Sequence, residues 1–228
     1  MDNPINQEMQ SLCDDEDFKD DQALHELQHL CSAALMQLRL KFEVLDSEFH
    51  LQHSTNPIHH IESRLKSPKS MAAKLRKNGY AVTIESAKQN LNDIAGIRVV
   101  CRFLEDVYDI ERVFMMHSDV KLIKREDYIA KPNFNGYRSL HLDVEIPVYL
   151  SSGVEYAKAE IQIRTVAQDF WASLEHDLRY KGAKKVPEHI SKEMFDTAAE
   201  IAAIDKKMQR MYYEIQSLEL GFRLFRIT

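Results

Sequence analysis

The sequence predicts an α+β or mixed α/β fold: a small mixed sheet in the middle of the chain, flanked by helices, with long helices at both ends. Two observations predict it. Apolar residues recur at spacings of three and four in both end segments, which is the period of a helix. The middle of the chain instead contains segments that are β-branched or that alternate between apolar and polar residues, as strands do. Strands interspersed with capped helical segments give the mixed arrangement.

Long helical extensions are predicted at both ends of a central domain at 53–182. After a polar tail at 1–13, the extension 14–52 carries an apolar stripe. Its members are Leu24, Leu27, Leu30, Ala34, Leu38, Phe42, Leu45 and Phe49. In the extension 183–228 a helix is predicted at 188–220, with Gly221 as its stop, because glycine is favoured just past a helix end. The stripes are more extensive than a small sheet can cover, so we expect the C-terminal extension to serve oligomerisation.

Two short helices are predicted before the first strand. Residues 53–57 break the long helix. Ser67 is a favoured N-cap and Pro68 suits the first helical position, so a helix is predicted from there to a stop at Gly79. A further short capped helix is predicted at 83–92, with Glu85 in its first turn.

Four strands are predicted, at 94–103, 121–127, 139–148 and 156–165. Helices are predicted at 105–117 and 167–178, and residues 129–136, rich in Pro, Asn and Gly, are expected to form a loop. The last two strands alternate, so that one face of each is apolar and the other is polar. The polar positions are Ser139, His141, Asp143 and Glu145 on one strand and Glu160, Gln162 and Arg164 on the other.

Composition and charge exclude several classes of function. The formal net charge of −6 argues against a general nucleic-acid binder, so no nucleic acid partner is expected. The stretch 61–80 nevertheless contains six Lys and Arg against one Glu, which suits a small anionic ligand as well as a solvated helix face. The three cysteines have no paired spacing, so a cytoplasmic location is expected. No apolar run approaches the ~18–20 residues that span a membrane, so no membrane association is expected.

Two carboxylates are candidates for a metal site. Asp93 directly precedes one predicted strand, and Glu160 lies on the polar face of another. Acids brought together at one end of a sheet repel each other unless a divalent cation lies between them. Mg²⁺ suits such a site because it binds carboxylate and phosphate oxygens. Acids are also common on exposed sheet ends, so the pattern leaves both interpretations open.

Several cations are candidates for an anion site. Ser70, Lys74 and Lys77 share one helical face, and Arg64 and Lys66 precede that helix in what we expect to be a loop. A helix N-terminus with Lys side chains binds anions such as a triphosphate, although a solvated basic face has the same spacing.

Arg98 and the segment 135–141 suggest nucleobase contacts. Arg98 lies in an apolar strand, where an arginine is costly unless it is paired or reaches a ligand, and its guanidinium can stack on a base. Tyr137 follows a flexible glycine and is a candidate for a second stacking platform, or else a plain turn aromatic. His141 is interpreted either as a contact to a ligand or as a satisfied sheet histidine.

Five segments in a fixed order resemble the synthetase domain of the RelA/SpoT family of (p)ppGpp synthetases. They are SRLKSPKS (63–70), DIAGIRVVC (93–101), PNFNGYRSLH (132–141), AEIQIRT (159–165) and DFWASLEH (169–176). The resemblance covers roughly residues 55–180 and is closest to the small single-domain alarmone synthetases, of the RelP/YwaC type. It implies a nucleotidyltransferase-like sheet. It also implies transfer of the β,γ-pyrophosphate of ATP to the 3′-hydroxyl of GTP or GDP, and a homotetramer.

The resemblance also implies roles for individual residues. The catalytic and metal-binding pair is Asp93 and Glu160, which bind Mg²⁺, with Glu160 also acting as the base towards the 3′-hydroxyl. The residues implied for ATP are Arg64 and Arg98, around the adenine, and Lys66, Ser70, Lys74 and Lys77, on the phosphates. The residues implied for GTP or GDP are Tyr137, His141 and Gln162, with Arg125 and Lys131 on the 5′-phosphates.

Three alternatives are weighed against this function. A non-catalytic nucleotide sensor would lack the carboxylates, whereas this chain has both Asp93 and Glu160. A changed acceptor, an adenine nucleotide or tRNA, is compatible with the spacing. His176 and Asp177 form a dipeptide found in metal-dependent phosphohydrolases, but that chemistry needs further His and Asp ligands on separate helices.

Overall fold

The computed structural model describes residues 17–52, 56–180 and 186–225 and contains a five-stranded mixed sheet. The strands are β1 (Ile58–Leu65), β2 (Ala95–Cys101), β3 (Lys121–Asp127), β4 (Leu140–Leu150) and β5 (Gly153–Thr165). Their order in the sheet is β1-β2-β5-β4-β3. Strands β2 and β5 are parallel, and the other neighbours are antiparallel. The predicted mixed sheet is confirmed.

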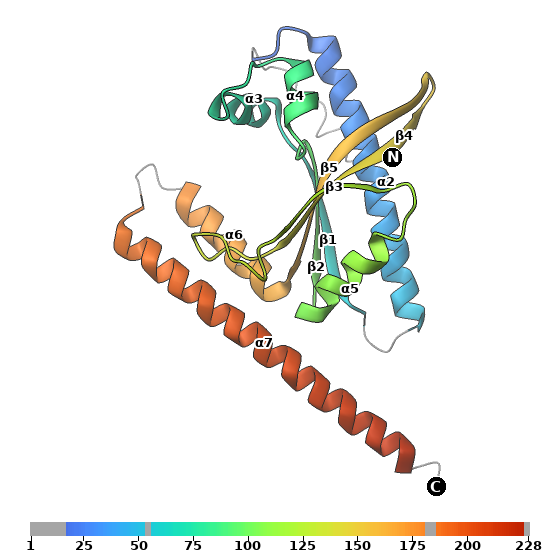
Figure 1. The fold of residues 1–228 in the computed structure, drawn as a ribbon, viewed down its shortest axis with the longest axis vertical. Coiled ribbons are helices and arrows are strands. Elements are labelled where there is room, and N and C mark those ends of the chain that lie inside the picture. Colours follow the sequence, from blue (N-terminus) through green and yellow to red (C-terminus); the bar gives the residue numbers. More distant parts are fainter. Residues whose placement is uncertain (1–16, 53–55, 181–185, 226–228) are drawn as a thin grey trace, which may run out of the picture.

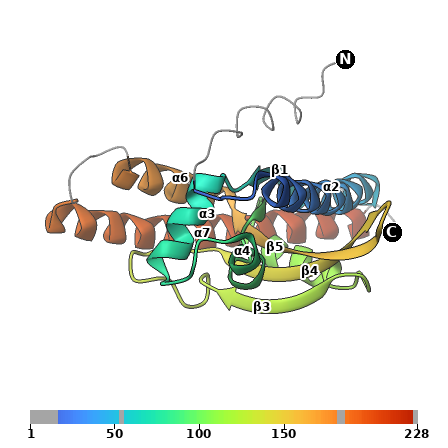
Figure 2. The ribbon, with the colours of Figure 1, turned by 90° about the horizontal axis from the view of Figure 1, so that it is seen from above.

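Helices cover the sheet on both sides. They are α2 (Asp21–Gln52), α3 (Pro68–Lys77), α4 (Ile84–Asn90), α5 (Leu104–Phe114), α6 (Val166–Tyr180) and α7 (Glu188–Phe225). In Figure 1, α2 and α5 lie on one side of the sheet and α6 on the other, while α7 runs past α6 and α5. Figure 2 shows α3 and α4 at one end of the sheet and β3 at its outer edge. None of the helices in the described part of the chain is long and apolar enough to cross a membrane.

One hydrophobic core fills the space between the sheet and the helices α2 and α5. Alternate residues of β4 and β5 are fully buried on this side, as their period of two predicts. The rings of Phe42 on α2 and Phe114 on α5 stack with centroids 4.3 Å apart. Phe42 belongs to the apolar stripe predicted for the N-terminal helix, so that stripe serves the core of this chain.

The predicted helix starts are confirmed at two positions. The Oγ of Ser67 accepts a hydrogen bond from the backbone N–H of Ser70, and Thr83 does the same for Ser86. The long N-terminal helix begins at Asp21 rather than at 14, because the Oδ1 of Asp20 accepts from the backbone N–H of Ala23 and caps it. Residues 1–16, including the predicted tail, lie outside the described residues.

Two predictions about secondary structure are wrong. No strand was predicted at 58–65, and Arg64 was expected to lie in a loop, but these residues form the edge strand β1. Only Ile58 of this strand is buried and its register is irregular near His60, so the sequence shows no alternation of apolar residues. Gly221 was expected to end the last helix, yet α7 continues to Phe225. A glycine costs a helix only about 1 kcal/mol and does not by itself end it.

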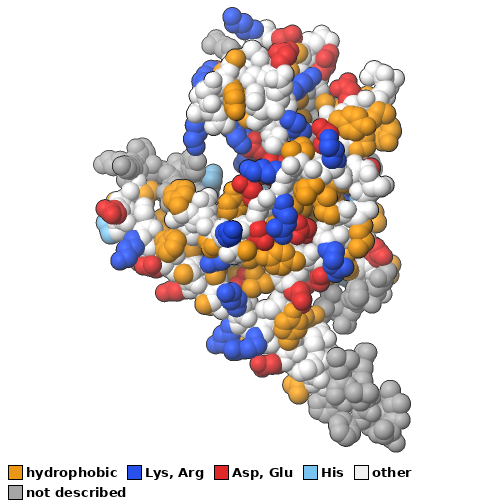
Figure 3. Space-filling model, in the orientation of Figure 1, with side chains coloured by type: hydrophobic (Ala, Val, Ile, Leu, Met, Phe, Trp, Pro, Cys, Tyr) orange, Lys and Arg blue, Asp and Glu red, His pale blue; other side chains and the backbone are white. Residues whose placement is uncertain are grey.

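Charged groups of both signs share the surface. On the face drawn in Figure 3, Lys and Arg side chains lie among Asp and Glu side chains instead of forming a separate basic patch. A protein that follows a long phosphate backbone presents a basic stripe. This face therefore agrees with the net charge of −6 in favouring small ligands.

A half-buried carboxyl at the start of α5 makes stability depend on pH. Burial raises the pKa of Asp106 to about 6, although its Oδ2 accepts a hydrogen bond from the backbone N–H of Phe103. The folded state therefore favours the protonated acid. Its stabilising contribution is fully present below the unfolded pKa of about 4 and is lost as the pH rises through 6.

We expect Asp106→Asn to remove this dependence, because the amide keeps an acceptor for Phe103 and carries no charge. Thermal unfolding midpoints of both proteins between pH 4 and pH 7 measure it. The midpoint of the wild type should fall relative to that of the variant over this range. Parallel profiles would contradict the assignment.

Candidate functional site

The register of the sheet places the predicted polar residues on one face. Glu62 of β1 pairs with Arg98 of β2, and Arg98 pairs in turn with Gln162 of β5. Glu160 is two residues from Gln162 and therefore shares this face. On the next strand, β4, His141 pairs with Gln162 and Asp143 with Glu160. The face opposite the core is thus lined by charged and amide side chains from four adjacent strands.

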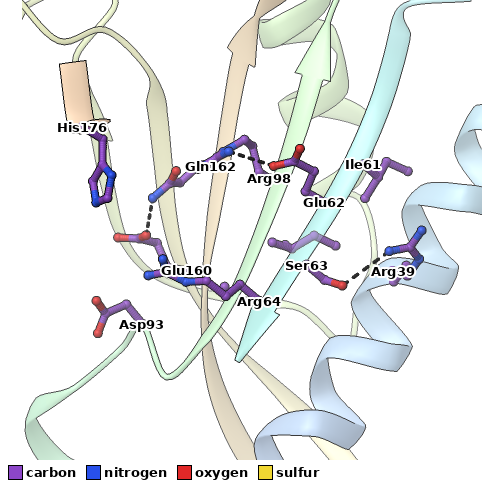
Figure 4. A pocket seen from close by; sticks show the side chains of 12 residues that line it. Arg39, Ile61, Glu62, Ser63, Arg64, Asp93, Arg98, Glu160, Gln162 and His176 are labelled. Atoms are coloured by element: carbon purple, nitrogen blue, oxygen red, sulfur yellow. Dashed lines mark hydrogen bonds and ion pairs between the residues drawn. The ribbon is translucent and has the colours of Figure 1, made fainter. Parts of the chain in front are cut away.

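These residues open onto a cleft of about 750 Å³. Its lining comes from β1, β2 and β5, from the segment before β2, and from α2 and α6. The residues are Arg39, Ile61, Glu62, Ser63, Arg64, Asp93, Gly96, Ile97, Arg98, Glu160, Gln162 and His176. Figure 4 shows the carboxylates of Asp93 and Glu160 directed into the same space, with His176 of α6 above them. A cleft of this size accommodates a nucleotide.

Asp93 is held by two lysines. Its Oδ2 lies 2.8 Å from the Nζ of Lys66 and 2.7 Å from the Nζ of Lys74. Burial alone would raise the pKa of Asp93, but the hydrogen bonds from Lys66 and Lys74 outweigh burial and lower it. Lys66 directly precedes the cap of α3 and Lys74 lies within that helix, so the cap at Ser67 brings both lysines to the carboxylate.

Glu160 lies at the centre of a polar network. Its Oε2 accepts a hydrogen bond of 2.6 Å from the Nε2 of Gln162, and its Oε1 lies 3.5 Å from the Nδ1 of His141. The Nε2 of His141 lies 2.8 Å from the hydroxyl of Tyr137. Burial would raise the pKa of Glu160, but the contacts with His141 and Gln162 lower it overall. Glu160 is therefore an ionised carboxylate at neutral pH.

A third acid, Asp143, lies beside Glu160 on β4. Burial raises the pKa of Asp143, and the negative charge of Glu160 adds to this, although the Nδ2 of Asn92 donates a hydrogen bond of 2.9 Å to its Oδ2. We predicted Asp143 to lie on the polar face but assigned it no role. The alternation of the strand is the signal that identifies it.

The acids suit a cation that binds oxygen. The Oδ1 of Asp93 is buried and has no hydrogen-bond partner among the described residues, so one lone-pair site on it is unused. Within residues 17–52, 56–180 and 186–225, no group of three or more His, Cys, Asp or Glu side chains is arranged to hold a metal. Two carboxylates fit Mg²⁺, which keeps several waters and takes its other ligands from substrate phosphates.

Two arginines from neighbouring strands contribute to the cleft. Arg64 lies on β1 and Arg98 on β2, and both line the cleft. The guanidinium of Arg98 contacts Glu62 at 2.8 Å and Asp169 at 3.6 Å, and its Nε has no partner among the described residues. Planar guanidinium groups in this arrangement offer stacking surfaces for a base.

Arg164 is a buried charge for which the sequence predicts no role. Its side chain is 2% exposed, and its nearest carboxylate is Asp169 of α6, whose Oδ1 lies 2.9 Å from an Nη. Burial lowers the pKa of Arg164. Because Asp169 also faces Arg98, one carboxylate of α6 neutralises arginines from two strands. The alternation of β5 predicts that Arg164 lies on the polar face. It does not predict that the side chain is buried.

Some predicted residues lie away from this centre. Arg125 forms a two-point ion pair with Glu111 of α5 and pairs in the sheet with the core residue Leu142, so it lies on the opposite face. Lys131 is exposed after β3, and Lys77 is exposed at the last turn of α3. Ser70 lies in the first turn of α3, where its Oγ accepts from Ser67. The structure therefore brings together most, but not all, of the predicted set.

Comparisons with known proteins are consistent with this site. Residues 63–185 match a family model described as a region found in RelA / SpoT proteins. The chain is 46% identical to "GTP pyrophosphokinase YwaC" of Bacillus subtilis over 183 residues, which cover 80% of this chain and 87% of that protein.

Two solved structures from the same organism resemble the fold. One is small alarmone synthetase 2, with a TM-score of 0.75 and 42% identity, covering 83% of this chain and 97% of that chain. The other is small alarmone synthetase 1 bound to its product pppGpp, with a TM-score of 0.79 and 28% identity, covering 85% and 98%.

The buried ion pair between Arg164 and Asp169 can be tested by Arg164→Met. We expect the free energy of unfolding to fall by about 3 kcal/mol, because the substitution leaves Asp169 without its closest cation. Urea denaturation measures this. Arg112→Met is the control, since Arg112 and Asp109 form an exposed pair on α5, and its cost should stay within about 0.5 kcal/mol. Equal costs for the two variants would show that Arg164 and Asp169 are not coupled in this way.

Proposed function

We infer the function of this chain from the RelA/SpoT family, to which it belongs, and from the cleft described above. The chain is a GTP pyrophosphokinase, a small alarmone synthetase, which makes (p)ppGpp from ATP and GTP or GDP. The observation that carries this inference is the pair of carboxylates, Asp93 and Glu160, facing one nucleotide-sized cleft with lysines and arginines around it.

The reaction needs one base and several cations. The 3′-oxygen of the acceptor attacks the β-phosphorus of ATP, and the bond from that phosphorus to the bridging oxygen of the α-phosphate breaks. AMP leaves with the electron pair, and the 3′-hydroxyl proton moves to a carboxylate of Glu160. The lowered pKa of Glu160 keeps it ionised for this role, and Gln162 and His141 hold it in position.

Asp93 and Glu160 are proposed to hold Mg²⁺. When bound, the ion would neutralise phosphate charge and orient the β- and γ-phosphates. The unpartnered Oδ1 of Asp93 supports this role. Lys66 and Lys74 now neutralise Asp93, so a cation at that carboxylate would free them to bind phosphate oxygens.

The two nucleotides are proposed to lie on either side of Glu160. Arg64 and Arg98 would enclose the adenine of ATP, with Lys66, Lys74 and the first turn of α3 on its phosphates. On the other side, Tyr137 would stack on guanine, and His141 and Gln162 would contact the acceptor. The ring of Tyr128, 5.2 Å from that of His141 at 85°, extends this aromatic surface. The place of Arg125 on the opposite face gives its predicted role no support.

A second function is a pyrophosphokinase with a different acceptor, an adenine nucleotide or tRNA. The acids and the ATP side of the cleft would serve it equally well. The product-bound relative, which carries pppGpp, favours a guanine nucleotide. A non-catalytic sensor is not favoured, because it has no need of the ionised Glu160.

A homotetramer in the cytoplasm is the proposed state of the protein. Exposed apolar residues on α6 recur every four residues, at Val166, Phe170, Leu174 and Leu178. On α7 the exposed apolar residues Ile204, Met208, Ile215 and Leu218 have similar spacings. Such stripes are typical of surfaces that pack against further helices.

The function is tested by Glu160→Gln in the presence of Mg²⁺, ATP and GTP. We expect kcat to fall on the order of 10²–10⁴-fold, because the amide cannot accept the proton. Anion-exchange separation of AMP and pentaphosphorylated guanosine measures both products. Glu155→Gln, at an exposed position of the same strand, should behave as the wild type. A wild type that converts ATP only with an adenine nucleotide or tRNA would identify the other acceptor.

The metal site is tested by Asp93→Asn in a Mg²⁺ titration. We expect the Mg²⁺ concentration for half-maximal activity to rise on the order of 10-fold or more, since a ligand is lost. Asp119→Asn is the control, because that carboxylate is paired with Lys41 and neither residue lines the cleft. An unchanged Mg²⁺ requirement in Asp93→Asn would show that Asp93 is not a ligand of the metal.

A further inference from the structure

The loop that carries Tyr137 lies directly against the C-terminal helix. Gly136 has φ +89°, and a Cβ added there would lie 2.6 Å from the Cβ of Ala198 and 3.5 Å from the Cδ2 of Phe195. Real Cβ atoms do not approach this closely, so only glycine allows the loop to touch α7 in this way. The neighbour of Tyr137 in the chain is therefore fixed against a helix that lies outside the sheet.

Further contacts hold the loop to α6 and α7. The Nδ2 of Asn135 donates a hydrogen bond of 3.0 Å to Glu175 of α6. Ala198 of α7 is buried in a small cluster with Trp171 of α6, and the ring of Tyr137 packs against this cluster. The indole N–H of Trp171 donates to the backbone oxygen of Met194, which joins the two helices.

A buried hydrogen bond ties α7 to the strand of the catalytic base. Asp205 of α7 is 4% exposed and accepts a 2.7 Å hydrogen bond from the hydroxyl of Thr165. Thr165 is the last residue of β5, the strand that carries Glu160. The helix is thus fixed relative to the reaction centre and in turn fixes the loop of Tyr137.

We propose that α7 positions the guanine of the acceptor nucleotide, and that Ala198 does so through its contact with Gly136. The inference rests on the proposed role of Tyr137 as the platform for guanine. The hydroxyl of Tyr137 reaches His141, which faces Glu160, so a displaced loop alters the acceptor side of the cleft. The ATP side is built from β1, β2 and α3, whereas this loop connects β3 and β4. Acceptor affinity should therefore depend on the contact, and ATP affinity should not.

The test begins with Gly136→Ala. Calorimetry with GDP gives the acceptor Kd without catalysis, and initial rates give KM for GTP and for ATP. We expect Kd for GDP and KM for GTP to rise on the order of 10-fold or more, because a misplacement of about 1 Å is costly in a site of this kind. KM for ATP should stay unchanged, which also shows that the variant is folded. Gly79→Ala is the control, with φ +76° and nothing within 4 Å of an added Cβ, and it should leave Kd for GDP unchanged.

A second variant separates the contact from backbone strain. In Gly136→Ala combined with Ala198→Gly, the removed methyl group makes room for the added one, so Kd for GDP should recover towards that of the wild type. Ala198→Val alone should weaken the binding of GDP, whereas Ala203→Val, at an exposed position of the same helix, should not.

Tyr137→Ala distinguishes failure of this inference from failure of the proposed function. If Tyr137→Ala weakens the binding of GDP while Gly136→Ala and Ala198→Val do not, the positioning role of α7 is overturned. The role of Tyr137 as the platform for guanine is then retained. If Tyr137→Ala leaves Kd for GDP unchanged, the platform is wrong and the role of α7 fails with it. A double variant that binds GDP as weakly as Gly136→Ala does would also overturn the role of Ala198.

Discussion

The alternation of side chains across the parallel pair of β2 and β5 is the constraint on which the site depends. It places Arg98 beside Gln162, and Gly96 beside Glu160, on the face away from the core. The same alternation puts Ile97 and Ile161 into the core, so a shift of one residue would exchange the two sets. Burial of the apolar residues in the core therefore fixes the register of the two strands. That register in turn fixes which polar residues face the cleft.

Much of this arrangement is predictable from local sequence. Ser67 with Pro68 and Thr83 give helix starts, and the alternating segments of β4 and β5 give the faces of the sheet. These signals work because each depends on neighbours within a few residues. The edge strand β1 is not predictable in this way, since one of its faces carries charged groups towards the cleft and only Ile58 is buried.

Other features depend on contacts between distant segments. The family resemblance implied a place beside the acceptor for Arg125, but the pairing of β3 with β4 directs it towards Glu111 on the other face. The burial of Arg164 follows from α6, which brings Asp169 to it. The approach of Gly136 to Ala198 joins residues that are 62 positions apart, and neither position shows this by its own pattern. Residue identity predicts which side chains are candidates for the site, whereas the topology of the fold decides which of these side chains lie close together.

The joint between α6 and α7 has a spectroscopic consequence. Trp171 is the only tryptophan of the chain, and its indole lies in that joint, bonded to Met194 and packed with Ala198. Emission excited selectively in the indole band therefore has one source, and its wavelength reports the polarity at a single place. The protein carries a built-in optical probe for the packing of its C-terminal helix, without any label.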